Sequence, residues 1–241
     1  MMDGKVVVIT GSGRGIGRYV AKTFAEAGAD VVVADIVPLD TVERELNELG
    51  AQTLAVPTDV RSEEQVRALV DAAMERFGRI DVLVNNAAIV THFLWGLPQW
   101  PRIRDMEKAF WDNVIGTNLG GTFLCTKYVL PHMEARRSGH VVSTMGGANP
   151  ATFGGSPYAV SKDAIRTFTR FVAEEEREFN VCVVAIAPGT QIATEEAPPE
   201  ARERMAGPEF VGDRFVRAAQ AGMDLSGHLL EIRDGELAIR A

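Results

Sequence analysis

The stretch VVVITGSGRGIGR, residues 6–18, joins an apolar, β-branched run directly to a cluster of glycines. The apolar run is typical of a strand that is buried on both faces of a parallel sheet. The common phosphate-binding spacing G-x-G-x-x-G does not fit, because Ile16 and Arg18 stand where the third glycine would fall. A second spacing, T-G-x-x-x-G-x-G, fits throughout, at Thr10, Gly11, Gly15 and Gly17.

In this second spacing each glycine has its own purpose. Gly11 lets the chain leave the strand, Gly15 lets the backbone approach a phosphate, and Gly17 lets the next helix pack closely. The start of that helix would offer free N–H groups and the positive end of its dipole to a pyrophosphate. A plain strand-to-helix turn is the alternative, since short glycine patterns also match by chance.

Similar apolar runs recur along the chain, as KVVVIT, DVVVAD, TLAVPTD, IDVLVNNA, GHVVSTM and VCVVAIAPG. Helical patterns lie between them, most clearly over residues 62–77, where Ser62 and Gln65 form a capping-box pair and Gly78 supplies the stop. Alternating strands and helices predict an α/β fold with a single doubly wound parallel sheet of Rossmann type, flanked by helices on both faces. We expect one domain over residues 1–241, with substrate loops at about 90–105 and 190–206.

The composition excludes several classes of protein. The net charge of −8 and the absence of a basic block argue against nucleic acid and against an anionic membrane as partners. Cys125 and Cys182 stand in apolar contexts and are expected to be buried free thiols. The four histidines have no metal-ligand spacing, so no metal is predicted. With no signal-peptide pattern and no membrane-spanning run, a cytoplasmic location is expected.

The second apolar run, DVVVADI, ends in Asp35, about 20 residues beyond the glycines. A carboxylate at this position would accept hydrogen bonds from an adenosine ribose and would repel a 2′-phosphate. The sequence therefore favours NAD over NADP, although Arg14 could partly neutralise a phosphate. A solvated strand end is the alternative interpretation of Asp35.

Further segments follow in a fixed order: TDV at 58–60, NNAA at 85–88, Asn118 within GTNLGGTF, YAVSK at 158–162 and APG at 187–189. Together with the glycine loop, they make the chain resemble the short-chain dehydrogenase/reductase family from Lys5 to about Gly235. The resemblance implies an NAD(P)-dependent enzyme acting on CH–OH groups, with a small-molecule substrate. It also implies a homotetramer or a homodimer.

The resemblance assigns cofactor contacts position by position. Asp59 would accept from the adenine amino group, Val60 would contact the adenine ring, and Pro188 and Gly189 would border the nicotinamide. Asn85 would steady the central strands. The implied cofactor-binding residues are Gly11, Ser12, Arg14, Gly15, Ile16, Gly17, Asp35, Ile36, Asp59, Val60, Asn86, Ala87, Tyr158, Lys162, Pro188, Gly189 and Ile192. The chain departs mildly from the family at Ala88, which replaces a glycine, and at Ala193, where a threonine is usual.

Three residues are the expected catalytic group: Asn118, Tyr158 and Lys162. Tyr158 and Lys162 are four residues apart and share one helix face. The nearby ammonium and a positive nicotinamide ring would favour the phenolate, so that Tyr158 can exchange a proton with the substrate. The resemblance gives Asn118 the task of holding a water that links Lys162 to solvent.

One expected part is missing from the sequence, namely the family's serine at the end of the fifth strand. Counting back 13 residues from Tyr158 gives Met145, whereas aligning the strand gives Gly146. Ser143 and Thr144 come too early unless the strand end is bulged. Losing one such donor costs on the order of 10²–10³ in rate. A catalytically weakened dinucleotide-binding sensor or scaffold is therefore the alternative to an active dehydrogenase, and dehydration or epimerisation is a third possibility.

The segment after the fourth strand is rich in aromatic residues, with Phe93, Trp95 and Trp100 near proline and glycine. If these rings line the pocket, the substrate is bulky and apolar, such as a ring-bearing alcohol or ketone. Packing against a neighbouring subunit is the alternative. His92 is expected to be a loop residue, and residues 190–206 a lid in which Ile192 and Met205 face the substrate.

Overall fold

The computed structural model describes residues 2–90, 101–147, 154–189, 192–195, 199–233 and 236–240, without the side chains of residues 201 and 209. Within these ranges the strands form one sheet in the order β3-β2-β1-β4-β5-β6-β7-β8. Their bounds are β1 (Val6–Thr10), β2 (Asp30–Asp35), β3 (Thr53–Pro57), β4 (Val82–Asn85), β5 (Gly139–Thr144), β6 (Val181–Ile186), β7 (Leu229–Arg233) and β8 (Glu236–Ile239). The first seven run parallel, as predicted, and β8 adds an antiparallel edge to β7.

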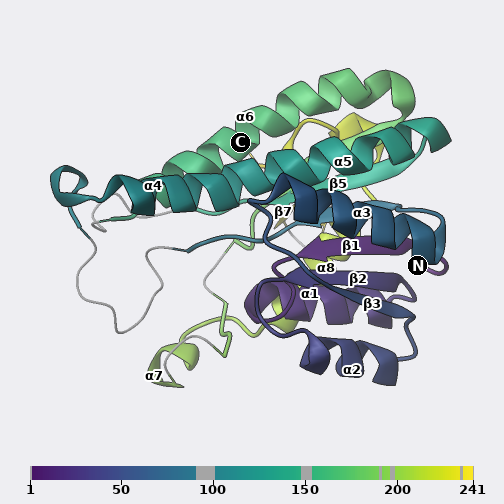
Figure 1. Cartoon of the computed structure of the whole chain (residues 1–241), viewed down its shortest axis with the longest axis horizontal. Coiled ribbons are helices and arrows are strands. Elements are labelled where there is room, and N and C mark those ends of the chain that lie inside the picture. Colours follow the sequence, from purple (N-terminus) through teal and green to yellow (C-terminus); the bar gives the residue numbers. More distant parts are fainter. Residues whose placement is uncertain are drawn as a thin grey trace.

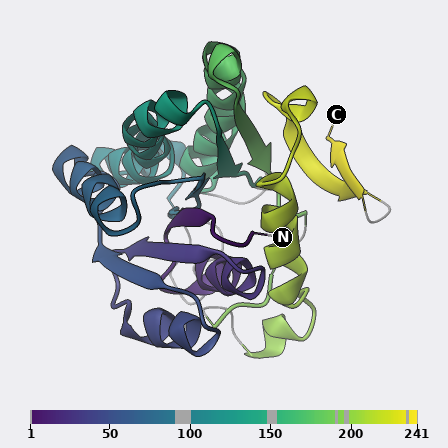
Figure 2. The ribbon, with the colours of Figure 1, turned by 90° about the vertical axis from the view of Figure 1, so that its right-hand side faces the viewer.

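Helices cover both faces of the sheet (Figures 1 and 2). One layer holds α1 (Gly15–Glu26), α2 (Asp40–Glu48) and α8 (Glu209–Ala218). The other holds α3 (Glu63–Phe77), α5 (Gly121–Arg136) and α6 (Ser156–Glu175). The helix α4 (Lys108–Ile115) continues through a π-helical turn, η3 (Gly116–Gly120), into α5. Shorter elements are η2 (Ile103–Asp105), η4 (Glu176–Phe179), α7 (Pro199–Arg202) and η5 (Met223–Leu225).

Strand β1 shows why the apolar runs belong in the middle of the fold. Val7 and Ile9 pack with the α1 layer, whereas Val6 and Val8 pack with the α3 layer. All four side chains are buried, because successive residues of a strand point to opposite faces. The predicted doubly wound α/β sheet is confirmed.

Helix α3 begins and ends at the residues that the sequence indicates. The Ser62 hydroxyl oxygen accepts from the Gln65 amide at 3.3 Å, and Gly78 closes the helix at a φ of 71°. The reciprocal capping-box bond differs from the expectation: the Gln65 side-chain oxygen accepts from the Asp59 amide at 2.8 Å. This bond ties the helix start to the loop after β3.

Cys125 and Cys182 are buried free thiols, as expected. In the described part of the chain, no helix is both long enough and apolar enough to cross a membrane. Over the same residues, no group of three or more histidine, cysteine or acidic side chains is placed to hold a metal ion.

A buried carboxylate, Asp81, joins several elements at the edge where the parallel strands begin. It accepts from the Val6 amide at 3.0 Å, from Arg79 Nε at 2.7 Å and from Arg136 at 3.1 Å, with Lys5 at 3.5 Å. Burial raises the pKa of Asp81, but these hydrogen bonds outweigh burial and lower its pKa to about 2. Folding therefore favours the ionised form of this carboxyl group.

Replacing Asp81 by asparagine should lower the free energy of unfolding by about 2 kcal/mol at pH 7, the worth of this pKa shift. Because the folded-state pKa is depressed, the contribution is complete above the unfolded pKa near 4 and disappears as pH falls toward 2. Urea unfolding at several pH values should therefore show a gap between the two proteins that narrows below pH 4. Asp71→Asn, at an exposed position of α3, is the control. A gap that stays constant with pH would contradict a charge-based role.

Candidate functional site

The glycine loop brings β1, α1 and the end of β4 into direct contact. Gly11 has a φ of +65°, and a Cβ there would lie 2.6 Å from the Cα of Ala87. A Cβ at Gly17 would overlap the Gly11 carbonyl oxygen. The Asn86 amide nitrogen donates to the carbonyls of Thr10 at 3.1 Å and Gly11 at 3.0 Å. No larger residue fits at positions 11 and 17 without moving the backbone.

The first turn of α1 already binds an anionic group of the chain itself. The Gly15 amide donates to Oε1 of Glu195 at 2.9 Å, and Arg18 Nη1 lies 3.8 Å from the same oxygen. A carboxylate at a helix N-terminus occupies the place that a phosphate oxygen would take. The loop residues therefore fit a pyrophosphate, and Glu195 stands where that group would bind.

Asp35 is held rigidly at the end of β2. Its carboxylate accepts from the amides of Gly13 at 2.9 Å, Ile36 at 2.7 Å and Val37 at 3.3 Å. Ile36 beside it is 69% exposed and offers an apolar surface. The hydroxyl of Ser12, by contrast, is used inside the fold: it donates to the Ile9 carbonyl at 2.9 Å and accepts from the Ala34 amide at 2.9 Å.

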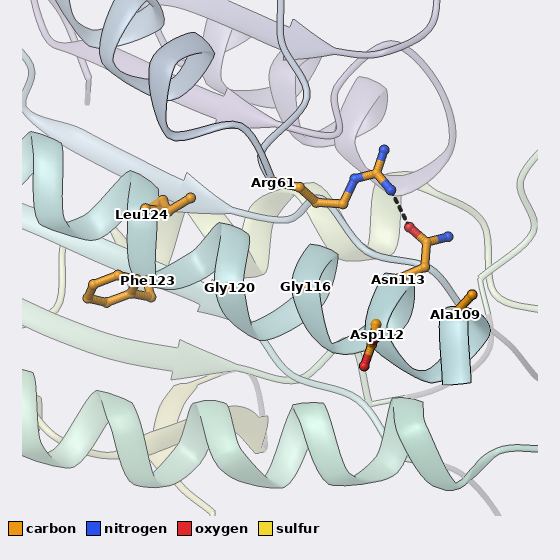
Figure 3. A pocket seen from close by; sticks show the side chains of 8 residues that line it. All are labelled: Arg61, Ala109, Asp112, Asn113, Gly116, Gly120, Phe123 and Leu124. Carbon is orange, nitrogen blue, oxygen red and sulfur yellow. Dashed lines mark hydrogen bonds between the residues drawn. The ribbon is translucent and has the colours of Figure 1, made fainter. Parts of the chain in front are cut away.

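The TDV segment places Asp59 and Val60 at the adjoining end of β3. Hydrogen bonds from the Arg61 side chain lower the pKa of Asp59, with Nε at 2.9 Å. Arg61 also donates to Asn113 of α4 at 2.5 Å (Figure 3). An adenine amino group would therefore share the Asp59 carboxylate with Arg61.

Figure 3 shows a surface pocket beside Arg61, between the loop after β3 and the helices α4 and α5. Its lining includes Asn113, Gly116 and Gly120. None of the sequence-predicted cofactor or catalytic residues lines it. We therefore place the candidate site at the carboxyl edge of the strands and not in this pocket.

Asn118 lies in the π-helical turn η3 and is completely buried. Its side-chain oxygen accepts from the Ile89 amide at 2.7 Å, and its nitrogen donates to the Ile89 carbonyl at 3.2 Å and to Ser161 Oγ at 3.0 Å. Ser161 Oγ donates in turn to the Tyr158 carbonyl at 2.7 Å. Asn118 thus links the chain after β4 to the first turns of α6. π-Helical turns are often found at functional sites.

Tyr158 and Lys162 lie on α6 with exposures of 6% and 2%. Lys162 Nζ donates to the Thr144 carbonyl at 2.7 Å and lies 5.8 Å from the centroid of the Tyr158 ring. Burial raises the pKa of Tyr158 to about 12 and lowers that of Lys162 to about 8. Burial is the cause of both shifts, since it disfavours the charged form of each group. The expectation that the ammonium and a positive nicotinamide together favour the phenolate concerns the cofactor complex and stays a prediction.

The structure distinguishes between the two positions proposed for the absent serine. Met145 is buried and packs against Ile165 and Ala185. Gly146 faces Tyr158, since a Cβ there would overlap the tyrosine hydroxyl oxygen. Gly146 is thus the residue that stands beside the tyrosine hydroxyl.

The hydroxyls of Ser143 and Thr144 do not replace the serine. Ser143 Oγ accepts from the Asn85 amide at 3.5 Å, and Thr144 Oγ1 donates to Asn86 at 3.5 Å. Asn85 also donates to Thr126 of α5 at 3.1 Å, so it connects β4 to its neighbours as expected. Both hydroxyls therefore belong to the hydrogen-bond network between the strands, and neither is paired with Tyr158 in the described part of the chain.

The remaining predicted residues lie at or near the end of β6. Gly189 is exposed with a φ of +85°, and Pro188 before it is half-buried. Ile192 is 9% exposed and packs with the α1 and α8 core, while Met205 is half-buried. The aromatic loop residues His92, Phe93, Trp95 and Trp100 lie outside the described residues, as do positions 190–191 and 196–198 of the expected lid and residues 234–235.

Two charged residues near this edge were missed from the sequence. Glu195 belongs to the expected lid at residues 190–206. Arg214 stands three residues after the buried Val211 and four before the buried Ala218, on the inner face of α8. The sequence signal that could have identified Arg214 is a charged residue on an apolar helix face. No sequence signal pointed to Glu195.

The comparisons with known proteins identify the family. The model of the short chain dehydrogenase family matches residues 5–203. A cis-4-hydroxycyclohexanecarboxylate dehydrogenase of Sinomonas cyclohexanicum is 35% identical, over 98% of this chain and 97% of its own. A 3-oxoacyl-[acyl-carrier-protein] reductase of Thermotoga maritima is 36% identical, over 84% and 81%. The crystal structure of levodione reductase has a TM-score of 0.83 and 28% identity, over 95% and 96%.

This chain belongs to the short-chain dehydrogenase/reductase family. It is an oxidoreductase of that family, whose relatives act on CH–OH groups and whose members use a nicotinamide dinucleotide.

Replacing Glu195 by glutamine should strengthen dinucleotide binding about threefold to tenfold. Glutamine keeps an oxygen that can accept from Gly15 but removes the negative charge that opposes a pyrophosphate. Calorimetric titration with NAD⁺ and with ADP-ribose measures the change, and Glu200→Gln on α7 is the matched control. Equal or weaker affinity in the Glu195 variant would show that the carboxylate does not compete with the cofactor.

Proposed function

We propose that this chain is an NAD-dependent oxidoreductase that interconverts a secondary alcohol and a ketone by hydride transfer. Tyr158 is the general acid and base. The observation that carries the proposal is the Tyr158–Lys162 pair, which lies buried on α6 next to the strand end that carries Thr144 and Gly146. A dehydrogenase that matches almost the full length of the chain supports the same reaction class.

The chain holds its cofactor along the carboxyl edge of the sheet. The amides of the first turn of α1 bind the pyrophosphate, Asp35 accepts from the adenosine ribose, and Lys162 lies at the nicotinamide ribose. When bound, the nicotinamide supplies the hydride acceptor or donor. The further cofactor contacts are Gly11, Ser12, Arg14, Ile16, Gly17, Ile36, Asp59, Val60, Asn86, Ala87, Pro188, Gly189 and Ile192. Three backbone amides fix the Asp35 carboxylate. Asp35 favours NAD because a carboxylate at the adenosine ribose would repel a 2′-phosphate.

The proton moves at the hydroxyl oxygen of Tyr158. With a pKa of about 12, the tyrosine keeps its proton at neutral pH and can donate it to a ketone. To accept a proton from an alcohol, the phenolate must be stabilised, and the Lys162 ammonium is the nearby positive charge of the chain. Asn118 positions this helix through Ser161 and holds the water that connects Lys162 with solvent.

Because position 146 is a glycine, no serine hydroxyl donates a hydrogen bond to the substrate oxygen. Asn118 does not replace it, because its amide nitrogen already donates to the Ile89 carbonyl and to Ser161. We infer that the Tyr158 hydroxyl alone, or together with a water, binds the substrate oxygen. The substrate is a ring-bearing alcohol or ketone, by analogy with the relative that acts on cis-4-hydroxycyclohexanecarboxylate.

A dinucleotide-binding sensor or scaffold is the second candidate, and the glycine at position 146 favours it. Self-association as a homodimer or homotetramer is proposed for either candidate. Its support is the exposed apolar side chains Phe123 on α5 and Val160 and Phe171 on α6. Retention of both Tyr158 and Lys162 favours the enzyme, since a scaffold would need neither.

Replacing Tyr158 by phenylalanine should lower kcat for ring-bearing secondary alcohols about 10²- to 10⁴-fold, the usual contribution of a general acid or base. NAD⁺ affinity should stay the same, because the ring remains in place. The measurements are NADH formation at 340 nm and calorimetry. Tyr128→Phe, which removes a hydroxyl bonded to Glu63 on the outer face of α3, is the control. Equal turnover by wild type and Tyr158→Phe would remove the tyrosine from the mechanism, and a wild type without turnover on any alcohol or ketone would favour the sensor.

Replacing Asp35 by asparagine should reduce the preference for NAD⁺ over NADP⁺ at least about tenfold. Asparagine keeps an acceptor for the loop amides but removes the charge that repels a 2′-phosphate. The ratio of kcat/KM for the two cofactors measures the effect, with Asp40→Asn as a charge-matched control nearby. An unchanged ratio would exclude Asp35 as the determinant.

A further inference from the structure

Arg214, on the inner face of α8, is buried in an unusual way. The residue is only 9% exposed, yet it makes no hydrogen bond and no ion pair with any residue that the structure describes. Its guanidinium carbon lies 4.2 Å from the centroid of the Phe210 ring. Its Nη1 would lie 3.2 Å from a Cβ at Gly189. Arg214 thus has an aromatic ring on one side and lies beside a glycine.

Such a position is costly for a guanidinium, which carries five N–H donors and a full charge. Burial lowers the pKa of Arg214, against the opposing effect of Glu231 and Asp213 at longer range. Both carboxylates are engaged elsewhere: Glu231 pairs with Arg233 and Arg240, and Asp213 pairs with Arg217. The charge of Arg214 is therefore not neutralised within the described chain.

The guanidinium lies at the carboxyl edge of the sheet, where Gly189 follows β6 and Gly146 follows the neighbouring strand β5. Side chains of a helix lean toward its N-terminus. The N-terminus of α8 lies at the carboxyl edge of the sheet, since α8 runs back between two parallel strands, β6 and β7. Gly189, beside which Nη1 of Arg214 lies, follows Pro188 in the segment that borders the nicotinamide under the proposed function. A positive group whose donors have no partner among the described residues thus stands beside this segment.

We propose that Arg214 binds a carboxylate of the substrate and selects ring-bearing hydroxy or oxo acids over their neutral analogues. This inference rests on the proposed function and deepens it. A carboxylate can accept two parallel hydrogen bonds from the planar fork of a guanidinium. It also supplies the negative charge that Arg214 does not find among the described residues. The relative that covers almost the whole chain acts on a cyclohexane that carries both a hydroxyl and a carboxylate, by its name.

The cofactor pyrophosphate is the other anion that could reach a buried arginine at this edge. Under the proposed function the pyrophosphate binds elsewhere, at the Gly15 amide and near Arg18. The Glu195 carboxylate lies at that place in the structure. Arg214 lies beside the nicotinamide end of the groove instead. The experiment distinguishes binding of a substrate carboxylate from binding of the cofactor pyrophosphate.

The test compares wild type with Arg214→Lys and Arg214→Met. The substrates are cis- and trans-4-hydroxycyclohexanecarboxylate, their methyl esters and cyclohexanol, each with NAD⁺. We expect wild type to prefer the acid. Arg214→Met should raise KM for the acid about 10- to 100-fold, in line with the loss of a charged hydrogen-bonded pair. It should leave kcat/KM for the ester and for cyclohexanol within about twofold. Lysine should restore part of the preference.

Two binding measurements complete the design. Calorimetry with the unreactive cyclohexanecarboxylate, in the presence of NADH, should show binding to wild type that is lost in Arg214→Met. Titration with ADP-ribose should give the same affinity for all variants. Arg217→Gln on the same helix, an exposed residue paired with Asp213, is the matched control, and thermal unfolding checks that each variant is folded.

Several outcomes would overturn the inference. A loss of ADP-ribose affinity in Arg214→Met would assign the arginine to the cofactor. An equal loss on acid, ester and cyclohexanol would make it a structural residue. Turnover of cyclohexanol by wild type without preference for the acid would refute carboxylate selection while leaving the dehydrogenase function intact. Absence of both turnover and cyclohexanecarboxylate binding would refute the inference and the proposed function together.

Discussion

The close contact between Gly11 and Gly17 holds the start of α1 against the end of β1, and the arrangement of the glycine loop depends on it. With no side chain between them, the start of α1 lies directly against the end of β1, and Asn86 fills the third side with hydrogen bonds to the carbonyls of Thr10 and Gly11. The first amides of α1 are then turned toward the open edge, where Gly15 already holds a carboxylate. Asp35 lies beside this loop, and its carboxylate accepts from the Gly13 amide.

Most of the architecture could be predicted because it is encoded locally. A parallel strand that is buried on both faces needs an uninterrupted apolar run, and six such runs with amphipathic helices between them leave few alternatives to a doubly wound sheet. Two features had no local signal. The antiparallel strand β8 has a mixed sequence, ELAI, at an exposed edge. The π-helical turn at Asn118 arises where α4 and α5 join without a break, and no residue type specifies such a turn.

In the candidate site, too, some features could be predicted from local sequence and others could not. Family motifs located the glycine loop, Asp35 and the Tyr158–Lys162 pair, because each is defined by residues close together in sequence. The contact of Glu195 with Gly15 spans 180 residues, and its partner is a backbone amide that carries no sequence signature. The raised pKa of Tyr158 was also beyond the sequence, since it depends on how completely packing excludes water from the ring. Whether residue 145 or 146 faces the tyrosine required coordinates, because a shift of one residue reverses the side of a strand.

The pairing of Gly146 with Tyr158 constrains how this enzyme can change. The phenol oxygen occupies the volume in which a side chain at position 146 would begin. Any side chain at position 146 therefore requires the end of the Tyr158 side chain to shift. A substitution there reaches the reaction in two ways, through the group that it adds and through the place that it leaves for the phenol.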